Sequence, residues 1–168
     1  MSDFLKSLSS YDIFNNLLPG VVFCVLTSKM FSVSLIQSDV VTGIFFYYFT
    51  GLIISRVGSI VLKPLLEKIR FISFSSYSDF ISASQEDPKI EILSEANNMY
   101  RTMLSMMMLL ALTGAYCFFK EDFEFLAEYS AYIFISLSTI LFAFSYRKQT
   151  NFIKSRIEKS ITKVSNQI

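Results

Sequence analysis

Residues 102–119 read TMLSMMMLLALTGAYCFF, eighteen consecutive residues without a charge. A second uncharged run of eighteen residues, YSAYIFISLSTILFAFSY, covers residues 129–146. A helix needs about 20 mostly apolar residues to cross a bilayer, and each run nearly reaches that length by itself. The apolar side chains surround both helices instead of forming one stripe, which is typical of membrane-embedded helices. These two stretches therefore predict membrane spans.

Two shorter uncharged runs precede them, Ile13–Ser28 and Val40–Ser55, each of sixteen residues. Both reach spanning length when flanking residues join the helix, since Lys29 can extend its ammonium group toward the headgroups. We therefore predict an all-α protein, an integral membrane four-helix bundle with cytoplasmic helical extensions, in one domain over residues 1–168. The predicted spans cover residues 12–33, 39–62, 100–120 and 127–147.

The composition agrees with a membrane protein and excludes several other classes. Of 168 residues, 52% are hydrophobic and 17% are charged, whereas soluble domains carry about 25% charged residues. The chain has no His, the commonest general base and metal ligand, and no nucleophile–base or metal-ligand motif. We expect no enzymatic activity, no cofactor and no metal. The net charge of +1 predicts no direct nucleic-acid binding.

The basic residues predict the orientation. Every Lys and Arg except Lys29 and Lys120 lies near the N-terminus, in the C-terminal tail, or in the stretch from Arg56 near the end of the second span to Arg101 at the start of the third. The connection KEDFEFLAE, residues 120–128, carries four acidic residues against one Lys. Because Lys and Arg accumulate on the cytoplasmic side, we expect a multi-pass membrane protein with both termini in the cytoplasm.

Two cytoplasmic segments, residues 63–99 and 148–168, are expected to be largely helical. The sequence KPLLEKIRFISF, residues 63–74, predicts a short amphipathic helix on the inner leaflet, with Pro64 in its first turn or at a kink. The Ser-rich residues 73–84 predict turns. Asp87-Pro88 is a helix start signal, and it predicts one helix over residues 88–119 that protrudes into the cytoplasm.

The C-terminal tail predicts an amphipathic helix that continues the fourth span. Ile157, Ile161, Val164 and Ile168 recur at spacings of four, three and four. This helix would pair with the stem of the third span or with a second copy, or would lie on anionic lipid. The basic residues expected to contact anionic inner-leaflet lipid or a cytoplasmic protein are Arg56, Lys63, Lys68, Arg70, Arg147, Lys148, Lys154, Arg156, Lys159 and Lys163.

Small residues recur in the second span. Gly51, Ser55 and Ser59 lie four residues apart, and Gly58 is adjacent. Small side chains let membrane helices approach closely, so this face predicts a helix-packing seam, either inside the bundle or between protomers of a homo-oligomer. Arg56, in the same stretch, either reaches the inner headgroups, pairs with an acid such as Glu95, or lines a watery cavity.

The first span contains Asn15 and Asn16, followed by Pro19-Gly20. Proline in a helix frees a carbonyl group and predicts a kink, which would serve the structure or form a gate. Asn side chains can bond to such freed backbone groups or to neighbouring helices.

The segment YDIFNNLLPGVVF, Tyr11–Phe23, resembles the opening of small bacterial membrane proteins of anti-phage defence loci. The four-span layout with both ends inside is similar to that of membrane subunits of Kiwa systems. This resemblance implies a membrane component linked to defence or stress, and it assigns no site residue.

Together these features favour a non-enzymatic, oligomeric inner-membrane component that binds a cytoplasmic protein partner through its helical stem and basic tail. One alternative is a pore-forming effector that permeabilises the membrane. Another is a small channel or carrier, although no span carries a charged residue at its centre, which disfavours an ion-coupled transporter.

Overall fold

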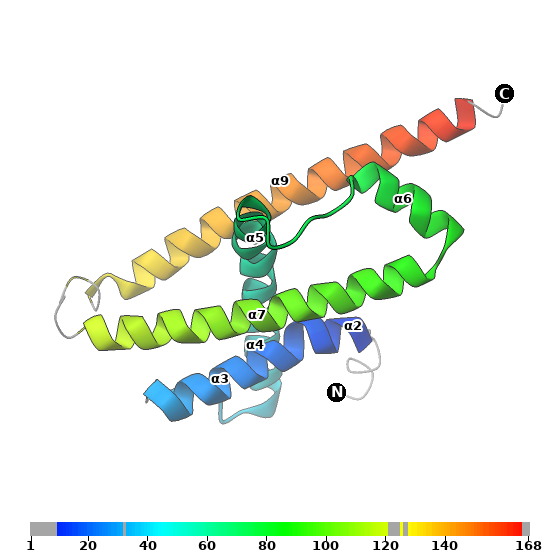
Figure 1. Ribbon diagram of the computed structural model, residues 1–168. Helices are drawn as coiled ribbons and strands as arrows, with labels where there is room; N and C mark the ends of the chain where they lie inside the picture. Colours follow the sequence, from blue (N-terminus) through cyan, green and yellow to red (C-terminus); the bar gives the residue numbers. More distant parts are fainter. Residues whose placement is uncertain (1–9, 32, 121–124, 126–127, 166–168) are drawn as a thin grey trace.

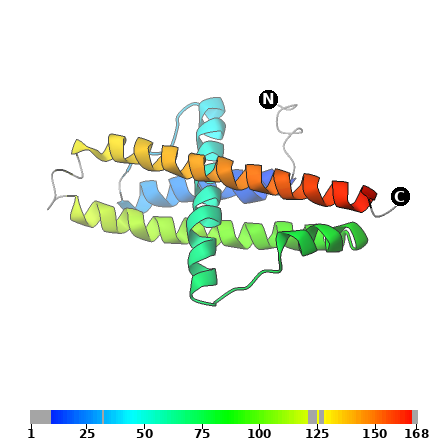
Figure 2. The same cartoon turned by 90° about the horizontal axis from the view of Figure 1, so that it is seen from above.

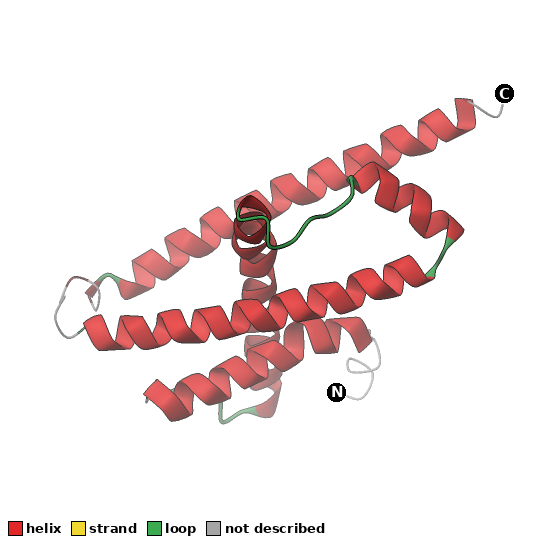
Figure 3. Ribbon diagram, in the orientation of Figure 1, coloured by secondary structure: helices red, strands yellow, loops and turns green. Residues whose placement is uncertain are grey.

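The computed structural model describes residues 10–31, 33–120, 125 and 128–165. Within these residues every regular element is a helix (Figure 3), which confirms the predicted all-helical class. Four helices in the described chain are long and apolar enough to cross a membrane, and they correspond to the four predicted spans: Ser10–Phe31, Val40–Lys68, Lys89–Phe119 and Ser130–Ile161.

The first long helix consists of α2 (Ser10–Asp12), the π-helical turn η1 (Ile13–Leu17) and α3 (Leu18–Phe31). The wide turn ends two residues before Pro19. A proline ring clashes with the carbonyl group four residues earlier and supplies no N–H. In η1 the N–H of Leu18 instead donates to the carbonyl of Ile13, five residues back. A kink is the predicted effect of Pro19-Gly20, and the feature that the structure shows before Pro19 is a local widening of the helix.

The second long helix also contains a π-helical turn shortly before a proline. It consists of α4 (Val40–Val57), the π-helical turn η2 (Gly58–Leu62) and α5 (Lys63–Lys68). Pro64 lies two residues after η2, as Pro19 lies two residues after η1. Because the wide turn accommodates the proline, the helix continues past it.

The amphipathic helix predicted over residues 63–74 is therefore wrong in its extent. The helix ends at Lys68, and Arg70 adopts a φ of 59°, in the left-handed region. Residues 72–76 have no regular structure. A non-glycine residue in the left-handed conformation cannot continue a right-handed helix, which explains the early end.

The turns predicted over residues 73–84 are wrong from residue 77 onward, because α6 (Tyr77–Glu86) is a helix. Ser76 is its N-cap: the Ser76 Oγ atom accepts a hydrogen bond from the Asp79 N–H at 3.1 Å and contacts Asp79 Oδ2 at 2.7 Å. Ile81 is buried at 3% exposure. The cap and this apolar anchor outweigh the low helix propensity of the serines.

Two long helices complete the fold, α7 (Lys89–Phe119) and α9 (Ser130–Ser165). The Lys89 N–H donates to Asp87 Oδ1 at 2.9 Å, so the predicted start signal forms, and α7 is one helix as expected. At 1.5 Å per residue, α7 is about 46 Å long, against about 30 Å for a hydrocarbon core. Much of the predicted acidic connection, residues 121–124 and 126–127, lies outside the described residues.

The arrangement differs from the predicted bundle. Helices α3, α7 and α9 run along a common direction, whereas the α4–α5 helix crosses them steeply (Figures 1 and 2). Helix α6 lies beside the C-terminal half of α9, at the N-terminal end of α7. Uncharged runs define the length of each span but not the direction in which two spans cross, so the sequence pattern could not give this geometry.

Two glycines let the first and second long helices cross in direct backbone contact. A Cβ atom on Gly51 would fall on the backbone carbonyl of Asn16, and a Cβ atom on Gly20 would fall on the backbone carbonyl of Tyr47. Only hydrogen at these positions lets the two backbones touch. A small apolar core of Ile54, Met106 and Leu110 follows on the α7 side. The crossing point thus holds the first, second and third long helices together.

Candidate functional site

A buried polar network lies beside the glycine crossing. Asn15 Nδ2 donates to Ser55 Oγ and to Asn16 Oδ1, each at 3.1 Å. Thr102 Oγ1 lies 2.9 Å from Asn15 Oδ1. These side chains come from three different long helices, and Thr102 has no exposed surface. Since buried amides and hydroxyls are costly without partners, this network specifies how the three helices align.

A cavity of about 730 Å³ opens next to this network. Its wall includes Asn15, Asn16 and Ser55, together with side chains from α5, α6, α7 and α9. Four cationic side chains line it: Arg56, Lys63, Arg101 and Lys148. Three acidic side chains also line it: Asp12, Glu67 and Asp79. It lies toward the ends of the spans that are predicted to face the cytoplasm.

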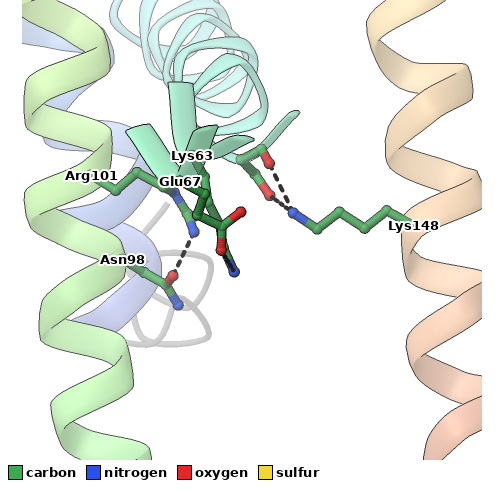
Figure 4. A network of polar contacts seen from close by, with 6 residues as sticks. Lys63, Glu67, Asn98, Arg101 and Lys148 are labelled. Atoms are coloured by element: carbon green, nitrogen blue, oxygen red, sulfur yellow. Dashed lines mark hydrogen bonds and ion pairs between the residues drawn. The ribbon is translucent and has the colours of Figure 1, made fainter. Parts of the chain in front are cut away.

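Lys148 crosses the cavity from α9 (Figure 4). Its Nζ atom donates to the Ser59 carbonyl and contacts Ser59 Oγ, both at 2.8 Å. Ser59 belongs to η2, where the wide turn changes the helical register before Pro64. Lysine has three N–H donors, so one remains after these two contacts.

Arg101 reaches toward the second helix from α7, on the side opposite Lys148 (Figure 4). Its Nη1 atom donates to Asn98 Oδ1 at 2.8 Å. Its Nε atom is buried and makes no hydrogen bond with the part of the chain that the structure describes. This guanidinium group therefore retains donor capacity inside the cavity wall.

Lys63 and Glu67 line the cavity between Arg101 and Lys148. Their side-chain charges are 3.9 Å apart, one helical turn along α5 (Figure 4). Lys63 Nζ also lies 4.0 Å from the centre of the Phe74 ring. This lysine thus has an acidic partner, whereas Arg56, Arg101 and Lys148 form no ion pair among the described residues.

Aromatic side chains form the opposite wall. Tyr77 of α6 stacks on Phe152 of α9 with ring centres 4.5 Å apart, and Phe80 lies 6.2 Å from Tyr77. Lys148 Nζ lies 5.8 Å from the Phe152 ring centre. Lys159 of the tail also donates to the Ser78 carbonyl. The tail therefore packs on α6, a partner that the sequence analysis did not consider.

The predicted small-residue seam lies inside the protomer. Gly51 touches Asn16, and Ser55 accepts a hydrogen bond from Asn15. A Cβ atom on Gly58 would lie 3.3 Å from Ser105 Cβ of α7, and Ser59 binds Lys148. All four seam residues thus contact other helices of the same chain.

The structure places the predicted basic contacts in several different surroundings. Arg56, Lys63 and Lys148 line the cavity, so the watery-cavity alternative for Arg56 fits its position. Lys154 lies 3.8 Å from the exposed Glu158. The side chain of Lys163 lies outside the described residues. Four more are exposed and lie outside the cavity: Lys68, Arg70, Arg147 and Arg156.

Sequence reasoning missed Asn98, Arg101 and Thr102 as site residues. Arg101 counted only toward the charge bias, and Thr102 only as the start of an uncharged run. The hydrogen bond between Thr102 and Asn15 joins residues 87 positions apart, which a single sequence does not pair. Polar residues at the ends of apolar runs could have indicated this site, because Asn15, Arg101 and Thr102 all lie at predicted cytoplasmic ends of such runs.

Within the described ranges, no group of His, Cys, Asp and Glu side chains is arranged to hold a metal ion. The cavity instead offers hydrogen-bond donors, cations and aromatic faces, which suit binding of a polar or anionic group. In comparisons with protein-family models, curated proteins and solved structures, the chain matches none.

Proposed function

We propose that this protein is a non-enzymatic, multi-pass component of the bacterial inner membrane that binds a soluble cytoplasmic protein. Both termini would lie in the cytoplasm. The helical layer formed by α6, the start of α7 and the end of α9 would be the binding surface. The observation that carries the proposal is the packing of α6 on both α7 and α9, because it holds these extensions in a fixed arrangement.

Exposed apolar side chains on this layer support a protein partner. Ile153, Ile157 and Ile161 follow one another at four-residue spacing on α9, and each is more than half exposed. Such a row on one face of a helix, flanked by charged residues, is suited to pack against another helix. Lys154 and Arg156 flank it, so an acidic rim on the partner would complement it.

The orientation is tested by labelling single cysteines in intact cells, in a chain whose own two cysteines are changed to serine. A cysteine at Gln37, between the first two long helices, should react with a membrane-impermeant maleimide. A cysteine at Ser84 in α6 should react only after the cells are opened. Reaction at Ser84 in intact cells would reverse the proposed topology.

Partner binding is tested by placing a photo-crosslinking amino acid at Ile157 in cells. We expect one discrete adduct with a soluble protein, and its loss when Ile153 and Ile161 become Asp while the protein remains inserted. The matched control places the crosslinker at Tyr132, an exposed position at the other end of α9. Adducts only with lipid or with other copies of this chain would contradict the proposal.

We further propose that the protein forms homo-oligomers and acts in anti-phage defence. Apolar side chains along α9, such as Phe134 and Leu137, are exposed, and would contact lipid or a second protomer. The resemblance of Tyr11–Phe23 to membrane proteins of defence loci supports the role. Plating efficiency of phage on cells that carry the gene with its neighbours tests it, with a chain truncated before Phe152 as the control.

A further inference from the structure

We infer that the cavity between α5, α6, α7 and α9 is a binding site for a phosphate ester, with the phosphate group held by Arg56, Arg101 and Lys148. This inference does not depend on the proposed cytoplasmic partner. It rests on charge, hydrogen-bond capacity, shape and the aromatic wall, which are taken in turn.

The first argument is charge. Of the three acids in the wall, Glu67 lies beside Lys63, and Asp79 accepts a hydrogen bond from Ser76 at the start of α6. The third, Asp12, lies 3.5 Å from Asn16 Nδ2. Arg56, Arg101 and Lys148 form no ion pair within the described chain. With four cations and three acids the wall carries one net positive charge, and none of these three cations has a carboxylate of the described residues within ion-pair distance, so an anion bound among them would lower their mutual repulsion.

The second argument is hydrogen-bond capacity. Arg101 Nε is buried and has no acceptor among the described residues, although its Nη1 atom is fixed on Asn98. Lys148 is fixed on Ser59 and retains a donor. Arginine forks match the paired oxygens of a phosphate, and charge-assisted bonds to them are among the strongest in proteins.

The third argument is size and wall chemistry. A cavity of about 730 Å³ is within the range of about 300–1,000 Å³ that is usual for small-molecule sites, and it is far larger than a phosphate ion needs. The aromatic residues Phe74, Tyr77 and Phe152 line it. A phosphate carried on an organic group would use both walls, since the cations bind the phosphate and the rings pack against the remainder.

The same chemistry occurs in a lipid headgroup and in a soluble phosphate ester. Both sources are tested on the full chain purified in a neutral detergent. Thermal unfolding is followed with a thiol-reactive dye in the chain with Cys117→Ser, because Cys117 is only partly buried, whereas the buried Cys24 becomes reactive on unfolding. The probes are short-chain phosphatidic acid, ATP and inorganic phosphate. Short-chain diacylglycerol and sodium chloride at equal ionic strength are the phosphate-free controls.

We expect a saturable rise in the unfolding temperature with a phosphate probe and none with the controls. A rise with phosphatidic acid alone assigns the site to a lipid headgroup, and a rise with ATP or inorganic phosphate assigns it to a soluble ligand. No rise with any of the three probes overturns the inference.

Substitutions of the lining residues test whether the phosphate probe binds in this cavity. Arg56→Gln should weaken the apparent affinity about tenfold or more, as expected for loss of a charge-assisted hydrogen bond, without lowering the unfolding temperature of the ligand-free protein. Lys148→Gln should weaken the affinity equally. Lys89→Gln, an exposed position on the helix that carries Arg101, is the matched control and should bind as the unmodified chain does. Unchanged affinity in both cavity variants, or equal loss in the control, overturns the assignment.

Discussion

Gly51 on the second long helix lies directly against the backbone carbonyl of Asn16 on the first, with no room for a side chain between them. The contact is next to the bonds that Asn15 makes to Ser55 and Thr102. The closest approach of two helices and the polar network that joins three of them therefore occur at one place. The cavity opens from this place, so its shape depends on the glycine contact.

Gly51→Ala should destabilise the fold. Alanine is favoured over glycine in a helix by about 1 kcal/mol, but a methyl group here meets backbone, which cannot move aside as a side chain can. Overpacking of this kind costs about 1–3 kcal/mol, so a net loss is expected. The temperature at which the detergent-solubilised protein loses its monodisperse elution peak measures it.

The matched control is Gly43→Ala, on the same helix. A Cβ atom there would lie 3.3 Å from the side chain of Tyr47, which can shift. The control should therefore be as stable as the unmodified chain or slightly more stable. Equal stability of the Gly51 and Gly43 variants would show that the first two helices do not touch at Gly51.

Asn15 and Thr102 should be energetically coupled. Their side chains lie 2.9 Å apart in a buried site. In a double-mutant cycle of Asn15→Ala and Thr102→Val, we expect a coupling energy of about 0.5–1.5 kcal/mol in thermal or denaturant unfolding. The cycle of Asn15→Ala with Thr113→Val is the control, because the Thr113 hydroxyl donates to the Leu109 carbonyl of its own helix. Coupling of the same size in both cycles would be incompatible with a direct bond.

The parts of this fold that follow from local rules could be predicted from the sequence. Length and polarity gave the four long helices, and Asp87-Pro88 gave the start of α7. The Ser76 cap was not predicted, because each of the surrounding serines by itself favours a turn. The steep crossing of the second long helix could not be predicted for a different reason. Gly51 indicates a close helix contact, but the sequence does not show that Asn16 is its partner. The cavity could not be predicted either, because Arg56, Arg101 and Lys148 come together only once the helices cross.

Arg70→Gly should stabilise the protein. Arg70 adopts a φ of 59°, which costs a residue with a side chain about 1 kcal/mol and costs glycine almost nothing. The side chain is exposed and makes no hydrogen bond or ion pair within the described residues, so little is lost. We expect an increase of up to about 1 kcal/mol in unfolding free energy.

Arg147→Gly provides the contrast for that variant. Arg147 is equally exposed but lies inside the helix α9, where glycine is disfavoured by about 1 kcal/mol. The two substitutions remove the same charge and should shift the unfolding midpoint in opposite directions. A decrease in both would mean that the segment after α5 does not hold the left-handed turn.

The stacking of Tyr77 on Phe152 should hold α6 against the tail. Phe152→Ala removes a ring whose centre lies 4.5 Å from that of Tyr77. An aromatic pair contributes about 0.5–1.5 kcal/mol beyond its buried area, so amide hydrogen exchange in residues 77–86 should accelerate about tenfold. Ile153→Ala, which truncates an exposed neighbour on the same helix, should leave that exchange unchanged. Equal protection of α6 in both variants would mean that the Tyr77–Phe152 contact does not position this helix, and the aromatic wall of the cavity would need another support.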